Sequence, residues 1–387
     1  MRVFIALVLL LAGVYALEKM AWSWPVTKAE TAGLPTRALS VFSEQQQLSV
    51  EVYAAQQSAL GRTVSRFLQP LLAQSSEISV EYIDPEANPA LLRDNGVRMH
   101  GEIILRQDGK KRHLTNLSYE DLTNLLQSLN TDEDKWLVFL EGFDSRLVGS
   151  LENSGLSSAL VELQKRGYPV ARAVLSPGAI IPDNVKALIL PAPRQTLDAE
   201  SLSWLQQQLQ KGVNIWWLQE PELINQQPQL DLMFDVQSPV SIEENPLILK
   251  SYPQHALNQA FDQPIQLTQA MSFETSAKPL WQTQQQQILA ATQTFDNSRL
   301  LVTGDADFIS NQFFYLAANQ SMMFRIVDWL LGYDDRFRWV PETQDGTQIQ
   351  LSRLEILTMA GLMLVLLPLM YLAMAIFRWL ANRRKTS

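Results

Sequence analysis

The feature that most constrains this chain is an uncharged apolar run near its C-terminus, Ile356–Phe377. At 1.5 Å per residue, a helix of this length spans about 33 Å, which is enough for the roughly 30 Å hydrocarbon core of a bilayer. A basic and aromatic cap follows directly, from Arg378 and Trp379 to Lys385, as is typical of a cytoplasmic helix end. The run therefore predicts a transmembrane helix over 354–380 and a basic cytoplasmic tail over 381–387.

A shorter apolar run, Val3–Leu17, follows Arg2 at the other end of the chain. It predicts a membrane anchor over residues 1–24, and the alternative is a signal peptide cleaved after Ala16. Either interpretation exports the segment that follows. We therefore expect the protein at the inner (plasma) membrane, in contact with lipid, with residues of about 25–352 extracytoplasmic (periplasmic).

The composition excludes several classes of function. The net charge of −9 argues against general nucleic-acid binding, because an acidic surface repels phosphate backbones. The chain has no cysteine and only three histidines, far apart in sequence, so neither thiol chemistry nor a catalytic zinc site is expected. We predict no metal and no cofactor.

Residues 40–130 alternate strand and helix patterns. Apolar and polar residues alternate over 48–53 and 78–83, a helical stripe covers 60–72, and Asp108-Gly109 predicts a hairpin turn. The order βαβαββα is typical of a thioredoxin-like fold. No redox cysteine follows the first strand, so we expect this domain to act as a scaffold or a binding module.

Residues 135–335 predict a second α/β domain of the doubly wound, flavodoxin-like kind. Apolar runs such as 136–140, 187–190 and 213–218 indicate strands buried on both faces of a parallel sheet, and amphipathic helices separate them. The Gln- and Pro-rich stretch 219–298 predicts an irregular insertion with some added strands. A juxtamembrane linker is expected over 336–353.

Polar side chains follow two of these predicted strands, where ligands bind in open α/β sheets. Carboxylates two residues apart could hold a cation or act as an acid and base, but turn and helix-start hydrogen bonds are the simpler interpretation of Asp305 and Asn311. The side chains after the earlier strand could join them in a polar pocket for a peptide, a sugar or a partner loop. The candidate ligand- or partner-binding residues are Glu141, Asp144, Arg146, Asp305, Asp307 and Asn311, and no catalytic residue is predicted.

The chain resembles the GldG-like auxiliary components of ABC transporters. The resemblance covers roughly residues 45–380, and its most specific block runs from Gly304-Asp-Ala-Asp through Asn311 to Val327-Asp-Trp-Leu330. Three weaker blocks are Tyr82–Pro85 with Asn88-Pro89, Val138–Gly142, and the stretch from Ile181-Pro182 through Leu190–Pro193 to Lys211-Gly212. Family members often carry Gly-His-Gly-Glu where this chain has Glu141-Gly-Phe-Asp144, so a role tied to that histidine is not carried over.

The resemblance implies a second domain similar to class I glutamine amidotransferases, without the cysteine nucleophile. It also implies an ABC permease and a cytoplasmic ATPase as partners, and this chain has no GxxxxGK[ST] phosphate loop of its own. We therefore expect a non-catalytic, membrane-anchored auxiliary subunit of an ABC-type transport system. The alternatives are an envelope hydrolase using Asp305, Asp307 or Glu141, and a membrane-tethered ligand-binding receptor.

Overall fold

The computed structural model describes residues 34–130, 135–336 and 338, and Pro35–Val340 form one compact unit. Both predicted membrane segments, 1–24 and 354–380, lie outside the described residues. Within those ranges no helix combines the length and the apolar character that crossing a bilayer needs; the longest, Ala59–Gln74, has 16 residues and polar groups along its exposed side. This finding contradicts the predicted flanking transmembrane helices, and with them the inner-membrane location, the extracytoplasmic placement of residues of about 25–352 and the cytoplasmic C-terminus.

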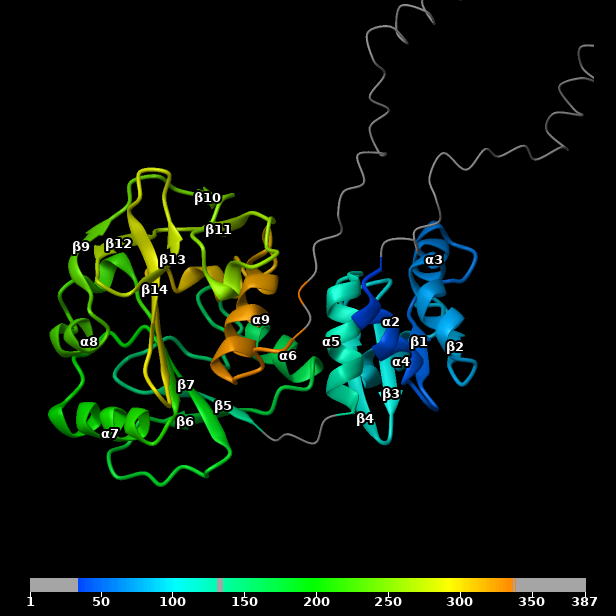
Figure 1. Ribbon diagram of the computed structural model, residues 1–387, viewed down its shortest axis with the longest axis horizontal. Helices are drawn as coiled ribbons and strands as arrows, with labels where there is room; N and C mark the ends of the chain where they lie inside the picture. The colour runs from blue at the N-terminus through cyan, green and yellow to red at the C-terminus, as the bar shows by residue number, and fades with distance from the viewer. Residues whose placement is uncertain (1–33, 131–134, 337, 339–387) are drawn as a thin grey trace, which may run out of the picture. The chain divides into compact units, whose positions relative to one another are not determined.

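The first sheet has four strands in the order β2-β1-β3-β4, with β1 parallel to β2 and antiparallel to β3 (Figure 1). Its strands are β1 (Ser49–Val52), β2 (Ser79–Tyr82), β3 (Ile103–Gln107) and β4 (Lys110–Leu114). Its helices are α2 (Thr36–Ser43), α3 (Ala59–Gln74), α4 (Pro89–Asn95) and α5 (Tyr119–Leu129). The β3–β4 turn follows from Asp108 and Gly109, which both adopt positive φ angles, 48° and 75°, as a tight hairpin requires.

The second sheet has nine strands in the order β6-β5-β7-β8-β15-β14-β12-β9, with β13 paired to β14. Its first five strands are parallel: β6 (Val170–Val174), β5 (Trp136–Glu141), β7 (Val185–Pro191), β8 (Asn214–Leu218) and β15 (Arg299–Thr303). In chain order these strands read 2-1-3-4-5, the order of flavodoxin-like doubly wound sheets. This part of the chain is thus mixed α/β with a parallel centre.

The predicted insertion extends that sheet. Its strands are β9 (Gln237–Ser241), β10 (Leu247–Leu249), β11 (Ile265–Leu267), β12 (Met271–Glu274), β13 (Lys278–Gln282) and β14 (Ile288–Thr294). β14 pairs antiparallel with β15, while β10 and β11 form a separate two-stranded ribbon. The short helices η2 (Pro221–Leu223), α8 (Pro228–Met233) and η3 (Ala256–Asn258) complete this segment.

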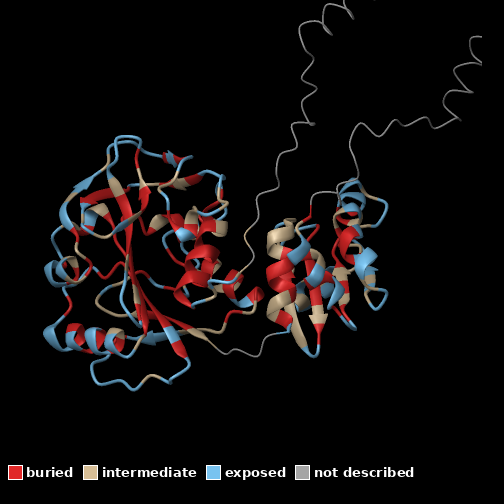
Figure 2. Cartoon of the chain, viewed as in Figure 1, coloured by how far each residue is buried: buried red, intermediate tan, exposed pale blue. Residues whose placement is uncertain are grey.

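The two faces of the large sheet have separate hydrophobic cores. Neighbouring residues on β8 show this, because Trp216 belongs to the core under α6 (Ser157–Lys165) and α9 (Asn319–Leu330). Trp217 belongs to the core under α7 (Ala199–Gln210) and α8. Figure 2 shows buried residues along the strands and on the sides of the helices that face them. Burial on both faces explains the unbroken apolar strands of the sequence.

The carboxyl ends of the parallel strands are held by close backbone contacts. Gly304, directly after β15, donates its N–H to Leu289 O and accepts from Met271 N, both at 2.7 Å. A Cβ atom at Gly304 would lie 2.3 Å from Met271 O, so only glycine fits there. The polar residues that follow Gly304 are thereby fixed relative to the sheet.

Candidate functional site

Arg146 occupies the centre of the polar cluster at the carboxyl ends of the parallel strands. The chain leaves β5 through three consecutive positive φ angles, at Gly142, Phe143 and Asp144 (117°, 53° and 53°). Arg146 then donates its N–H to Pro191 O at the end of β7, at 2.9 Å. This is the point where the strand order reverses, which is where open α/β sheets place their sites.

The guanidinium of Arg146 is buried and joins three segments of the chain. It pairs through Nε with Glu220, which follows β8, and through Nη2 with Asp307, after β15, at 2.7 Å. Its Nη1 donates to Ser154 O at 3.1 Å. Burial alone would lower the pKa of Arg146, but the carboxylates of Glu220 and Asp307 outweigh it and raise that pKa. The cation is therefore held permanently charged and fully paired.

Asp305 is buried beside this cluster but is bound to the backbone. Its Oδ2 accepts from Thr268 N at 2.5 Å and its Oδ1 from Asp307 N at 2.6 Å. Burial, reinforced by the charge of Asp307, raises the pKa of Asp305 to about 8, despite the two N–H donors. At neutral pH the side chain is mainly neutral and its oxygens are already used.

Glu220 belongs to the cluster although it is not among the residues predicted from the sequence. It follows Gln219 directly after the buried strand β8, so the reasoning that selected Asp305 would have found it. Its second oxygen lies 3.7 Å from Arg194, an exposed side chain.

The structure does not bring the other three candidates into the cluster. Glu141 accepts from Val148 N at 3.0 Å and lies 3.6 Å from Arg172. Asp144 is exposed. Asn311 acts as a clasp: its Oδ1 accepts from Ser158 N at 2.8 Å, at the start of α6. The Nδ2 of Asn311 donates to two carbonyl oxygens of the loop after β5, Ser150 O at 2.8 Å and Glu152 O at 2.7 Å.

This arrangement limits the chemistry that the cluster can perform. A cation between Asp305 and Asp307 would have to displace the Arg146 guanidinium and a backbone N–H. Over the described ranges, no group of three or more histidine, aspartate or glutamate side chains could hold a metal ion. Four buried polar atoms, on residues close in sequence to the cluster residues or bonded to them, have no hydrogen-bond partner within the described part. They are Ser145 Oγ, Gln219 Nε2, Thr268 Oγ1 and Ser310 Oγ. Such atoms could bind water, but they supply no activated nucleophile.

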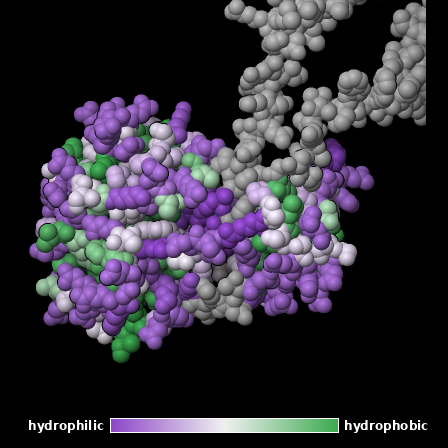
Figure 3. Space-filling view, viewed as in Figure 1, coloured by the Kyte–Doolittle hydropathy of each residue, from purple (hydrophilic) through white to green (hydrophobic). Residues whose placement is uncertain are grey.

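Large apolar side chains are exposed beside the cluster. Leu147 and Leu151, on the loop after β5, are 63% and 88% exposed, and Val174 at the end of β6 is 67% exposed. The register pairs Val174 with Glu141, so the two strand ends are adjacent. Figure 3 shows apolar side chains reaching the surface in small groups among hydrophilic ones. These three exposed side chains, Leu147, Leu151 and Val174, are called the apolar rim below.

No family model and no curated protein matches the chain. Among solved structures, the mmIFT52 N-terminal domain gives a TM-score of 0.41 at 14% identity, covering 50% of this chain and 97% of that one. Mitochondrial thioredoxin 3 from Saccharomyces cerevisiae gives 0.20 at 15% identity, covering 22% and 83%. The exo-beta-1,4-mannosidase Op5Man5 from Opitutaceae bacterium strain TAV5 gives 0.35 at 10%, covering 73% and 50%. These partial likenesses carry no functional argument.

Proposed function

We propose that this protein is a non-catalytic auxiliary subunit of an ABC-type transport system and binds the permease through the apolar rim. The observation that supports this most directly is the contrast between the two parts of the strand-end region. The Arg146 cluster uses its charged groups internally, while the apolar rim beside it is exposed. Internally paired charges favour a structural role for the cluster, and an exposed apolar rim favours contact with another protein.

Arg146 of the cluster and Asn311 outside it hold the loop that carries two rim residues in a defined conformation. Arg146 binds Ser154 O, and Asn311 binds Ser150 O and Glu152 O, so the loop that carries Leu147 and Leu151 is tied at several points. A loop ordered before binding loses less conformational entropy on association. This favours a docking surface over an adaptable ligand-binding loop.

The alternative of a hydrolase is less well supported by the same geometry. A general base must be able to reach the proton that it abstracts. The oxygens of Asp305 are both occupied by backbone N–H groups, Asp307 pairs with Arg146, and Glu141 accepts from Val148 N. The first sheet likewise has no cysteine with which to perform thioredoxin chemistry.

The proposal can be tested by co-purifying the full chain with the ABC permease and ATPase of its source organism. We expect the double variant Leu147→Asp/Leu151→Asp to lose the permease while keeping its own thermal unfolding temperature. Leu232→Asp is a matched control, because Leu232 is 78% exposed but lies on α8. Equal recovery of the permease with the double variant and with the control would refute the proposed surface. Failure of the parent chain to bind any ABC permease would refute the function itself.

A further inference from the structure

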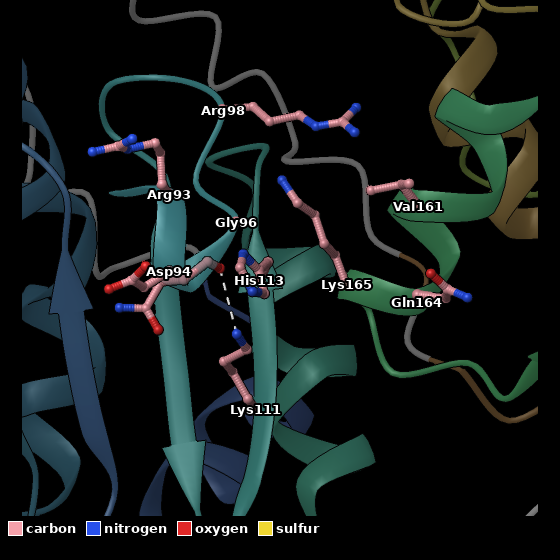
Figure 4. A pocket seen from close by; sticks show the side chains of 10 residues that line it. Arg93, Asp94, Gly96, Arg98, Lys111, His113, Val161, Gln164 and Lys165 are labelled. Atoms are coloured by element: carbon pink, nitrogen blue, oxygen red, sulfur yellow. Dashed lines mark hydrogen bonds between the residues drawn. The ribbon is translucent and has the colours of Figure 1, made fainter. Parts of the chain in front are cut away.

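A cavity lies away from the Arg146 cluster and differs from it in character. It has a volume of about 370 Å³ and is lined by the segment from α4 to β3, by β4 and by α6 (Figure 4). Four of its lining side chains are cationic, Arg93, Arg98, Lys111 and Lys165, and one, Asp94, is acidic. The chain as a whole carries a net charge of −9, so this cavity is locally cationic in a protein that is acidic overall.

A buried carboxylate organises one wall of this cavity. Glu102 is fully buried and accepts from Lys165 Nζ at 3.0 Å and from Arg98 N at 3.0 Å. His113 Nδ1 lies 2.6 Å from the same carboxylate. Burial alone would raise the pKa of Glu102, but the hydrogen bonds from His113, the Arg98 amide and Lys165 outweigh it and lower that pKa. Glu102 therefore stays charged and fixes both Lys165 and the loop that carries Arg98.

The charge of Lys165 is largely balanced by its own partners. Besides its bond to Glu102, Lys165 Nζ lies 3.5 Å from Glu162, one turn earlier on α6. Both carboxylates are buried, so this lysine is held in place on the wall of the cavity. Lys165 therefore offers the cavity N–H donors, while its positive charge is balanced by Glu102 and Glu162.

The other three lining cations have neutral contacts. Lys111 donates to Asn95 O at 3.4 Å, the dashed line in Figure 4. The side chain of Arg98 lies near the hydroxyl of Tyr315, whose own O–H donates to Glu162. The guanidinium of Arg93 has no hydrogen-bond or ion-pair partner within the described part of the chain, although its backbone carbonyl accepts from Gly96 N. These three cations thus face one lining carboxylate, Asp94.

We propose that this cavity, the cationic pocket, binds a phosphate group, either as free inorganic phosphate or as the phosphate monoester of a small molecule. Guanidinium groups present a planar fork of N–H donors that matches phosphate oxygens, and an ammonium group adds a mobile point charge. Several cations on separate elements suit a multiply charged anion better than a singly charged carboxylate. Figure 4 shows Lys165 reaching from α6 toward the loop that carries Arg98, and Arg98 extending toward the α6 side, while Arg93 points away from α6.

The test is isothermal titration of the full chain at constant ionic strength with three probes: inorganic phosphate, glycerol 3-phosphate and succinate. We expect saturable binding of phosphate with one site per chain. The double variant Arg93→Gln/Arg98→Gln should weaken it by at least about tenfold, since each lost charge-assisted hydrogen bond is worth on the order of one decade. Both arginines are exposed, so circular dichroism should show an unchanged fold.

A matched control removes the same charge from another face. Arg62 and Arg66 are both on α3 of the first sheet, and Arg62→Gln/Arg66→Gln should bind phosphate as the parent does. Tighter binding of glycerol 3-phosphate than of phosphate assigns the ligand as a monoester, and the reverse order assigns it as the free anion. No saturable binding of either, equal binding of succinate, or an unchanged affinity in the Arg93/Arg98 variant would each overturn the proposal.

Discussion

Arg166, just after α6, donates from Nη1 to Oδ1 of Asp121 on α5 at 2.8 Å, and so joins a helix of the large sheet to a helix of the small one. The guanidinium also lies 3.7 Å above the ring of Phe324 on α9. Nearby, Arg325 pairs with Glu120 at 2.9 Å across the same two groups of helices. Charged side chains therefore connect these helices where apolar packing would be the usual solution.

Replacing Arg166 with glutamine should destabilise the protein by about 3–5 kcal/mol, because it leaves Asp121 largely buried without its cation. Burial alone would raise the pKa of Asp121, but Arg166, Ser118 and Asn116 outweigh it and lower that pKa. A lowered pKa contributes stability above the ordinary value of 3.8, and that stability is lost as the pH falls through the folded-state pKa. The difference between variant and parent should thus shrink in acid. Urea unfolding at several pH values measures this, with Arg66→Gln as the control; an equal loss in both variants would contradict it.

Asp305 should make the protein less stable as the pH rises. Its folded-state pKa of about 8 lies above the ordinary 3.8, so the neutral carboxyl contributes stability below pH 3.8 that is lost as the pH rises through about 8. Asp305→Asn removes this dependence. Because asparagine has one acceptor oxygen for two backbone N–H groups, the variant also loses about 1–3 kcal/mol at every pH.

The two effects of Asp305→Asn separate in a pH series of urea unfolding. At pH 4–5 the variant should have the lower free energy of unfolding. As the pH rises toward 8, the free energy of unfolding of the parent should fall relative to that of the variant by at most about 1.4 kcal/mol per pH unit. Parallel curves for variant and parent over that range would show that Asp305 is charged throughout.

Arg146 and Glu220 should behave as a coupled pair. Arg146→Met leaves the buried Glu220 without its cation, at a cost of about 3–5 kcal/mol. Adding Glu220→Gln removes the unpaired charge, so we expect the double variant to recover about 1–3 kcal/mol relative to the sum of the single changes. Chemical unfolding of the four proteins of this cycle measures the coupling. Strict additivity would mean that the two side chains do not interact in solution.

Gly304→Ala should be strongly destabilising, because its Cβ would lie 2.3 Å from Met271 O and 3.1 Å from Leu289 O. Both atoms are backbone, so the strands themselves would have to move, and we expect a loss of about 3 kcal/mol or more. Gly178 separates crowding from backbone strain: its φ angle is 77°, and nothing lies within 4 Å of the point that an added methyl group would occupy. Gly178→Ala should cost only about 1 kcal/mol. Similar unfolding midpoints for the two variants would contradict this account.

The parallel strands were predictable because burial on both faces leaves an unmistakable apolar run. The predicted strands 136–140, 187–190 and 213–218 correspond to β5, β7 and β8. The small sheet was similarly clear, since its predicted turn at Asp108-Gly109 has a local cause in the positive φ angles of both residues. Helix α2, before the first strand, was missed because it has only eight residues and no side-chain N-cap marks its start.

The pairing of the insertion strands could not be predicted, because it depends on contacts that no local pattern encodes. β9 and β12 join the sheet through β14, and β12 and β14 share one register pair, Phe273 with Ile288. In the candidate site, the positions of Arg146, Asp305 and Asp307 after predicted strands placed them at the same edge of the sheet. The sequence did not indicate which groups they would bind there. Arg146 could equally have faced solvent, and only the fold shows that Glu220 meets it.

The clasp formed by Asn311 ties the loop after β5 to a residue made much later in the chain. Asn311 and Ser158, which share a hydrogen bond, are 153 positions apart. At a synthesis rate of about 5–20 residues per second, roughly 8–30 s pass between the synthesis of Ser158 and that of Asn311, which accepts its N–H. Nascent chains arrested before and after residue 311 would differ in protease cleavage near Ser150 if this holds. During that interval the start of α6 lacks its bond to Asn311, and Leu147 and Leu151 on the preceding loop are available for contacts with other chains.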